Sequence, residues 1–582
     1  MRRRKRRETM KLVRPAILLA SFASIWIAFA ASAQTTPPPG PNDGDPALHG
    51  TGATSSANVI VELIDWMTAN QPFFDANYLP AGSGTGKNAW RNTTPQLGPF
   101  GSPFSGWYIV QFGFSESSVT LSDILAYNKN VQRFGGSAIV VPQFVLPIAI
   151  AYNPVYAKNS VSGTEYRFNV QAPQALPDAI TGLPKVVGGL RLSRAAYCGI
   201  FNGTIRNWND GLLTILNGGV SLRDPADANW GVSGIPIRLV GRLDKSGATD
   251  IFTRALAAQC PGGSRITTNA EALPFDPTLG TAPDFTGVRI DTPYRPGGAG
   301  FAGPTNAVGN QYFNRTTGSI QSVSGGVPSQ PAGVGNGTGL FLLADGSAGV
   351  SAAIAADPDI GTSAYKVNGK IGYIGSDYIA NAKGASPKIF TAALSRPSAT
   401  GTFLLPSAAN ATNAFAGILP PQSASTGAFQ VVDTRLVRSP TGGVKIPATR
   451  DNPFAWHDVL YPTPASGLAS PSAGYPITGT TQILLNTCYK ATNQPHIVKW
   501  VGYNMGTPTT VFTNSTTGIL AKSNIAAVSD DWKRAIIQTF LVNSNETNSG
   551  QRLGDLDLWI ETAQTTGADH CNVGTLSGSP GM

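Results

Sequence analysis

The strongest constraint on the fold comes from residues 240–252, VGRLDKSGATDIF. They predict a strand over 237–240, a Ser-Gly turn, and a helix from about 248 to 259. Apolar residues recur at helical spacing after the turn and would bury one face of this helix. Ser246 is a favourable N-cap, and Gly247 allows the backbone to come close to a ligand.

The start of this predicted helix suits an oxyanion. Its first backbone N–H groups lack helical partners and lie at the positive end of the helix dipole. Arg242 could add a bidentate guanidinium, and Asp244 could hold that guanidinium in place. Taken alone, the stretch fits an ordinary capped strand–turn–helix equally well.

Three further turns are built from small polar residues. Residues 50–56, GTGATSS, precede a helix with an apolar stripe. That stripe consists of Val59, Ile60, Leu63, Ile64 and Met67. Residues 81–88, AGSGTGKN, nearly match a nucleotide P-loop, but they begin with Ala instead of Gly and end with Asn instead of Ser or Thr. Residues 112–117, FGFSES, place the carboxylate of Glu116 after an apolar strand. These turns, one Arg and one acidic residue could converge on a small oxyanion.

The composition indicates a loop-rich, weakly charged globular protein. Of 582 residues only 13% are charged, while 66 are Gly and 44 are Pro. The length allows two or more domains. The formal net charge is +9, but residues 1–33 contain eight Lys or Arg and one Glu. The remainder is therefore nearly neutral, and we expect no nucleic-acid partner.

Residues 1–33 are predicted to be an export signal. A basic region precedes an apolar run over 16–30, and Ala31-Ser32-Ala33 has the small residues of a cleavage site. Cleavage is expected after Ala33, and residues 34–47 are expected to form a disordered linker. The mature protein would be periplasmic or secreted.

An exported protein with four cysteines is expected to form two disulfides, and three connectivities are possible. We predict Cys198–Cys260 and Cys488–Cys571. A metal site is the alternative use, but no CxxC or HxxxH spacing occurs, so no metal is expected.

The order of these motifs resembles the phosphate-binding (PstS-like) family of bacterial phosphate ABC transporters, and most closely its DING proteins. The similar loops are 52–54 (GAT), 82–87 (GSGTGK), 112–116 (FGFSE) and 242–249 (RLDKSGAT). Further similar segments lie at 141–153, 197–209, 370–374 and 475–480.

The resemblance implies an α/β protein with the two-lobed periplasmic-binding-protein (type II) fold and a ligand cleft at the hinge. Lobe 1 would contain 48–153 and 478–582, and lobe 2 would contain 154–477. Two regions exceed the family plan, at about 262–345 and 386–474. They are expected to decorate lobe 2 as long loops or small hairpins.

The resemblance also implies a set of phosphate-binding residues. The set is Thr54, Ser55, Ser83, Glu116, Arg242, Ser246, Gly247 and Ala248, with Asp244 in support. Two of these positions depart from the family pattern, because Glu116 replaces an Asp and Ala248 replaces a Thr. The lost Thr hydroxyl is expected to weaken phosphate binding.

The expected function is capture of inorganic phosphate for uptake, with the membrane permease of a phosphate ABC transporter as partner and no cofactor. Enzymatic turnover is not expected, because the four histidines are scattered and no Gly-x-Ser-x-Gly elbow opens a helix. Two alternatives stay open. One is a surface or secreted protein that binds another ligand or acts in adhesion, and the other is a phosphohydrolase.

Overall fold

The structure is a computed structural model of the 582-residue chain. It describes residues 48–72, 74–92, 110–171, 175–177, 184–186, 189–201, 205, 207–231, 234–242, 246–260, 311–314, 319–322, 341–344, 346–380, 388–396, 399–422, 433–463, 466–506, 518–542, 547–548, 551–552, 558–563 and 571. The predicted export signal and linker therefore lie outside the described residues. Among the helices in these ranges, none combines the length and the apolar character needed to cross a bilayer.

Two long antiparallel strands form the centre of a mixed sheet: β4 (Ala138–Tyr152) and β22 (Thr478–Asn486). All of β22 and all of β4 after its first residue are buried, as expected for a strand covered on both faces. The main sheet runs in the order β12-β11-β13-β10-β16-β4-β22-β3-β1-β2. The other strands on this path are β12 (Ser319–Ser322), β11 (Gln311–Asn314), β13 (Phe341–Ala344), β10 (Arg238–Arg242), β16 (Lys370–Gly375), β3 (Phe112–Ser115), β1 (Leu48–Gly52) and β2 (Ala76–Pro80). Two short strands, β17 (Phe390–Thr391) and β24 (Ala526–Ala527), also pair with β4.

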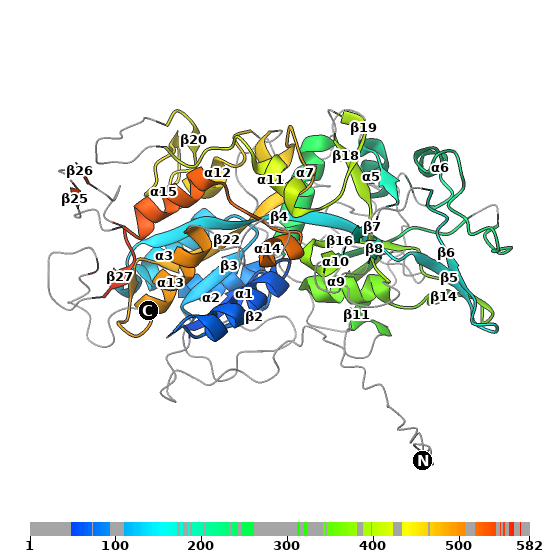
Figure 1. Cartoon of the computed structure of the whole chain (residues 1–582), viewed down its shortest axis with the longest axis horizontal. Coiled ribbons are helices and arrows are strands. Elements are labelled where there is room, and N and C mark those ends of the chain that lie inside the picture. The colour runs from blue at the N-terminus through cyan, green and yellow to red at the C-terminus, as the bar shows by residue number, and fades with distance from the viewer. Residues whose placement is uncertain are drawn as a thin grey trace, which may run out of the picture. The chain divides into compact units, whose positions relative to one another are not determined.

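Strand β4 belongs to both halves of this sheet. Its first part pairs with β22, whose other edge pairs with β3, and its last residues pair with β16. In Figure 1, β4 runs from the helices around β1 to β3 across to those around β16. Parallel pairs flank this antiparallel centre on both sides, so the sheet is mixed. We retain the lobe boundaries given above as a proposal.

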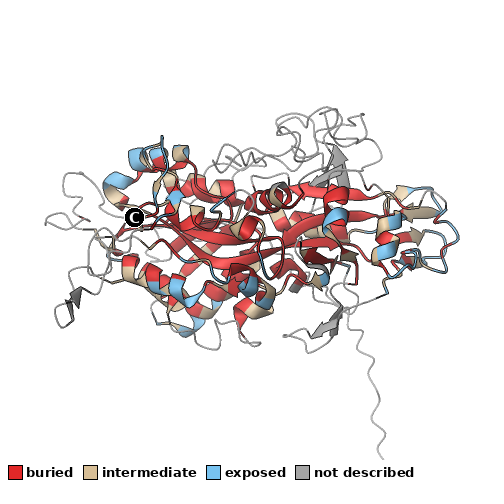
Figure 2. Ribbon diagram, turned by 90° about the horizontal axis from the view of Figure 1, so that it is seen from above, coloured by how far each residue is buried: buried red, intermediate tan, exposed pale blue. Residues whose placement is uncertain are grey.

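Helices cover the sheet and are buried on the side that faces it and exposed on the outer side, as Figure 2 shows for several of them. Helix α1 (Ala57–Asn70) buries the whole predicted apolar stripe. Helix α7 (Gly247–Gln259) follows β10 and is capped by the side chain of Ser246, which accepts from Thr249 N. The predicted helix and its N-cap are thus confirmed, and the strand before it extends to Arg242. Further helices are α2 (Ser83–Asn92), α3 (Leu121–Asn130), α9 (Gly346–Ala355), α10 (Asp377–Ala380), α12 (Ala455–Asp458) and α15 (Asp530–Phe540).

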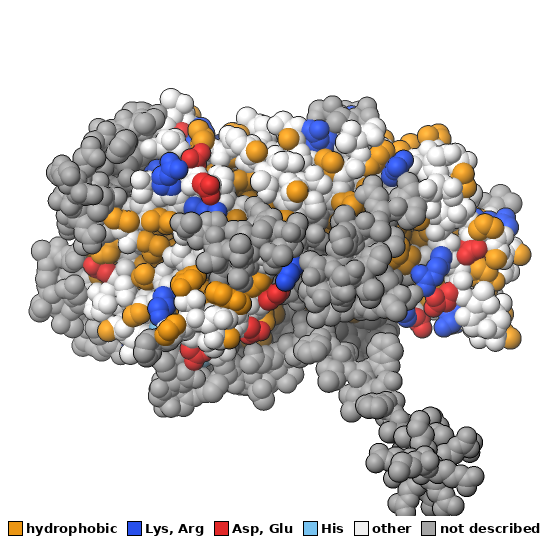
Figure 3. Space-filling model, viewed as in Figure 1, with side chains coloured by type: hydrophobic (Ala, Val, Ile, Leu, Met, Phe, Trp, Pro, Cys, Tyr) orange, Lys and Arg blue, Asp and Glu red, His pale blue; other side chains and the backbone are white. Residues whose placement is uncertain are grey.

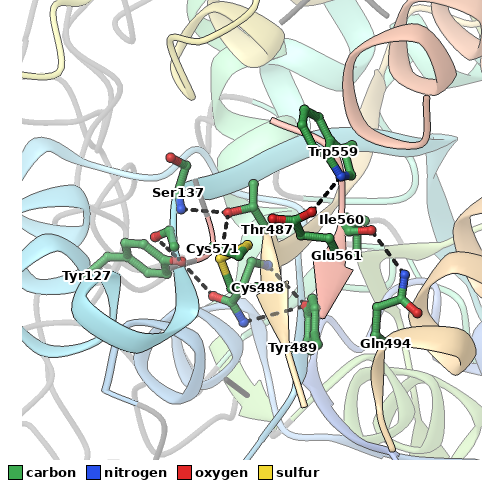
Figure 4. The surroundings of a disulfide bond; sticks show 12 residues. Tyr127, Ser137, Thr487, Cys488, Tyr489, Gln494, Trp559, Ile560, Glu561 and Cys571 are labelled. Carbon is green, nitrogen blue, oxygen red and sulfur yellow. Dashed lines mark hydrogen bonds between the residues drawn. A yellow bond between two sulfur atoms is a disulfide. The ribbon is translucent and has the colours of Figure 1, made fainter. Parts of the chain in front are cut away.

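Both predicted disulfides are confirmed. Cys198 in α5 (Arg194–Phe201) is bonded to Cys260, which directly follows α7. Cys488 in β23 (Cys488–Tyr489) is bonded to Cys571 and ties it to the protein core (Figure 4).

The region 262–345 contributes to the sheet where it is described. β11 and β12 form an antiparallel hairpin, in line with the expected small hairpins. β13, at the end of this region, lies parallel between β10 and β11. It is therefore a strand of the main sheet, which the sequence did not predict. Residues 261–310 and 323–340 lie outside the described residues.

The region 386–474 contacts two helices that are far apart in the sequence, α7 and α15. Trp456 of α12 packs against Trp532 and Phe540 of α15, with ring centroids 6.1 and 5.4 Å away. Tyr461 lies under the guanidinium of Arg254 from α7, at 4.6 Å. The region thus bridges α15 and α7 in addition to carrying the β18–β19 hairpin (Ala393–Arg396 and Ala399–Leu404). The strand-like segment at 429–432 lies outside the described residues.

Candidate functional site

Arg242 ends β10 inside the protein and is only 1% exposed. Its guanidinium donates to Thr54 Oγ1 at 2.7 Å, to Ser347 Oγ at 3.2 Å and to Ser55 Oγ at 3.5 Å. A guanidinium is planar and can present two parallel N–H groups to an oxyanion. The predicted loops at 50–56 and 240–252 therefore meet at this side chain.

Glu116 follows β3 and reaches the same group of hydroxyls. Its Oε1 accepts from Ser55 N at 3.0 Å and from Ser56 Oγ at 3.3 Å, and its Oε2 accepts from Ser83 Oγ at 3.4 Å. Ser83 also accepts from Glu116 N at 3.1 Å. The carboxylate thus bonds to two donors, Ser55 N and Ser83 Oγ, that the family resemblance assigns to phosphate.

Burial makes the ionised form of Glu116 less favourable than it is in water. Burial raises the pKa of this carboxyl to about 7, although Arg242 and the hydrogen bonds from Ser55 and Ser56 lower it in part. Two other titratable groups face it: Tyr78 from β2 and Asp377 from α10. Burial raises the pKa of Asp377 as well, and the Glu116 charge adds to that effect. Near neutral pH, both the ionised and the neutral form of Glu116 are therefore populated.

Glu116 should make the protein more stable in mild acid than at neutral pH. Its folded-state pKa rises from the usual 4.5 to about 7, so its contribution is complete below pH 4.5 and is lost as the pH rises through 7. At 1.36 kcal/mol per pKa unit, the contribution is roughly 3 kcal/mol. The measurement is urea unfolding in phosphate-free buffer. As the pH rises from 4.5 to 8, the free energy of unfolding of Glu116→Gln should increase by about this amount relative to that of wild type. A difference that does not change with pH would contradict this assignment.

The start of α7 touches the loop that carries Glu116. A Cβ added to Gly247 would lie 2.5 Å from Glu116 Cβ and 2.5 Å from Ser117 N, so only glycine fits this approach. Ser246 and Ala248 are buried beside it. The structure thus brings together the predicted residues from all four loops, while Asp244 lies outside the described residues.

The sequence did not predict a fifth loop, at the start of α9. Ser347 Oγ lies 3.0 Å from Ser55 Oγ, and Ser347 N donates to Thr54 Oγ1 at 3.3 Å. Gly346, before it, has a positive φ of 65° and lies next to Thr54. The sequence did contain a signal for this loop. Gly346-Ser347 opens a helix, as the small-residue turn Ser246-Gly247 does.

Lys87, from the stretch that resembles a P-loop, has a structural role, and its contacts lie outside this cluster. Its Nζ donates to Ser118 O at 3.0 Å and pairs with Asp123 Oδ2 at 3.3 Å, and both charged side chains are fully buried. Asp123 also completes the capping box of α3 with Thr120. Lys87 therefore holds the chain that follows Glu116.

The described side chains suit a small oxyanion that carries a proton. A buried guanidinium, several hydroxyls and a backbone N–H supply donors, and they come from Thr54, Ser55, Ser83, Arg242 and Ser347. All five residues are buried, with at most 5% of each exposed. Glu116, which is hydrogen-bonded to Ser55 N and Ser83 Oγ, supplies an acceptor for a protonated ligand oxygen.

The chain is similar to one protein family and to several known proteins. The sequence matches the family described as PBP superfamily domain over residues 32–414. Phosphate-binding protein PstS 3 of Mycobacterium leprae is 30% identical over 241 residues, 41% of this chain and 50% of that relative. The chain thus matches half the length of that protein.

Two further comparisons cover most of the chain. Alkaline phosphatase L of Pseudomonas aeruginosa is 22% identical over 471 residues, 81% of this chain and 83% of that protein. The crystal structure of an ancestral soluble variant of the Human Phosphate Binding Protein aligns with a TM-score of 0.51 at 21% identity. It covers 88% of this chain and 100% of that one, and this likeness in fold confirms the expected two-lobed α/β architecture.

Proposed function

Because the chain belongs to the PBP superfamily, we propose that it is an exported protein that binds inorganic phosphate at the Arg242–Glu116 cluster. One observation carries this proposal: donors from separate loops and one carboxylate share a single buried hydrogen-bond network. Relatives that are named phosphate-binding proteins support the choice of ligand. A protein that binds another ligand or acts in adhesion is not favoured, since most of the residues expected to bind phosphate belong to this network.

Glu116 would distinguish phosphate from sulfate. A buried carboxylate repels a bound anion unless the anion can donate a proton to it. Phosphate near neutral pH carries such a proton and sulfate does not. The Glu116→Gln variant, whose amide can donate a hydrogen bond, should therefore bind sulfate at least about tenfold more tightly than wild type.

Calorimetric titration with phosphate and with sulfate measures this difference. The control is Glu165→Gln, which makes the same chemical change at a partly exposed carboxylate on β6 (Glu165–Arg167). Sulfate binding that is equally weak in Glu116→Gln and in wild type would show that another group selects the ligand. If wild type bound neither anion, the proposed function would fall.

Export and a transporter partner are part of the same proposal. Two disulfides are typical of proteins that fold outside the reducing cytoplasm, which supports a periplasmic or secreted location. On the face seen in Figure 3, Lys and Arg side chains lie among Asp and Glu side chains. Delivery of phosphate to a membrane permease would follow from the PstS-like resemblance.

Hydrolysis of phosphate esters is the second candidate, because one relative is named alkaline phosphatase L. We favour binding without turnover. A chromogenic phosphate ester, tested with protein of verified purity, separates the two. Hydrolysis by wild type that disappears in an Arg242→Met variant would establish an enzyme.

A further inference from the structure

Ser118, in the loop after Glu116, is hydrogen-bonded to three different parts of the chain. The backbone N of Ser118 donates to Asp250 Oδ2 at 3.4 Å, and its carbonyl accepts from Lys87 Nζ at 3.0 Å. Its hydroxyl accepts from Arg438 Nη2 at 2.5 Å. These partners come from α7, from α2 and from the 386–474 region. Ser118 is thus a junction between distant parts of the chain, two residues from the carboxylate of the site.

Residues 433–461, here named the strap, include Arg438 and its partner Asp458. Arg438 donates to Val119 O at 2.8 Å in addition to Ser118 Oγ. The same guanidinium pairs with both oxygens of Asp458, and it lies 4.3 Å from the centre of the Phe454 ring. The Arg438 guanidinium outweighs the effect of burial and holds the pKa of the Asp458 carboxyl well below its usual range. Arg438 is therefore held in one orientation, with its remaining N–H groups aimed at the Glu116 loop.

The C-terminal part of the strap is anchored at two points, Trp456 and Tyr461. On one side Trp456 packs on Trp532 and Phe540 of α15. On the other side Tyr461 lies against Arg254, whose guanidinium bonds to Asp250 Oδ1 at 2.8 Å. Asp250 is the residue that accepts from Ser118 N, so the strap reaches the loop directly and through α7.

We propose that the strap positions the carboxylate of Glu116 by clamping Ser118 and Val119 through Arg438 and Asp458. The proposal gives the 386–474 region a role in the binding site and rests on the proposed function. Ser118 and Val119 lie immediately after the residues that touch Gly247. A shift of the clamped loop would therefore move Glu116 away from Ser55 N and Ser83 Oγ and separate it from the start of α7.

The test removes both charges of the clamp, since a single change would leave a buried charge unpaired. The variant is Arg438→Gln/Asp458→Asn. Its matched control is Arg435→Gln/Asp433→Asn, another close Arg–Asp pair of the strap. The hydrogen bonds of Arg435 go to Asp433, Leu419 and Pro420 and do not reach the Glu116 loop.

Two measurements are needed. In phosphate-free buffer, the amides of residues 116–118 should exchange hydrogen at least about tenfold faster in the clamp variant than in the control. In stopped-flow experiments, phosphate should dissociate roughly tenfold faster, the effect of losing one hydrogen bond to a charged group. The control should match wild type in both.

Equal exchange at 116–118 in the two double variants would overturn the proposal. So would faster exchange without faster dissociation, because the loop would then move without affecting the ligand. The exchange experiment uses no phosphate. If wild type did not bind phosphate, the proposed function would fail, and exchange would still decide whether the strap holds the loop.

Discussion

Arg242→Met should weaken phosphate binding by a factor on the order of 10² to 10⁴ while leaving the protein folded. Arg242 is buried and supplies the one guanidinium that contacts the described hydroxyl cluster, through Thr54, Ser55 and Ser347. Two hydrogen bonds to a charged ligand are worth roughly 3–6 kcal/mol together. Their loss corresponds to a decrease in affinity on the order of 10² to 10⁴. Calorimetric titration of both proteins with phosphate measures it.

The control for this experiment is Arg238→Met. Arg238 lies on the same strand and is equally buried, but it pairs with Asp359 and donates to Asn368 O at 3.0 Å. We expect this variant to lose stability without losing phosphate affinity. If both variants bound phosphate equally weakly, the effect of Arg242 would be that of a structural ion pair, and the proposed site would be wrong.

Replacing Cys198 and Cys260 together with Ser should lower the free energy of unfolding by about 4 kcal/mol, in the chain-entropy estimate for a loop of this length. The bridge closes a loop of 62 residues, which restricts the unfolded chain. It also joins the end of α7 to α5. Urea unfolding of the variant and of the oxidised wild type gives the difference.

This loss should leave phosphate affinity nearly unchanged at temperatures where the variant is folded. The bridge lies at the C-terminal end of α7, whereas Ser246 and Gly247 lie at its start. Thirteen helical residues separate the two ends by about 20 Å. A large fall in affinity in the folded variant would indicate that the helix start depends on the bridge, contrary to this expectation.

Local sequence patterns were sufficient to predict the pieces of the site. The capped helix after Ser246 and the apolar stripe of α1 follow from the spacing of neighbouring residues, and both appear as predicted. These features depend on backbone groups and side chains within a few residues of each other, so the sequence contains all the information they need. The order of the loops, through its family resemblance, led to their grouping around an anion.

Partners far apart in the chain were decided only by the tertiary structure. Glu116 bonds to Ser55 N across 61 residues, Ser347 reaches Arg242 across 105, and Arg438 reaches Ser118 across 320. Polar side chains of these types are common, so nothing local shows that Arg438 reaches the Glu116 loop, and the Gly-Ser turn at Ser347 does not by itself reveal its partners. Their roles depend on which strand ends meet and on which face of α15 the strap covers. The pairing of β4 with β22 and β16 sets the first, and the packing of Trp456 on Trp532 sets the second. Such long-range contacts result from burying the whole apolar surface at once, and no short stretch of sequence specifies them alone.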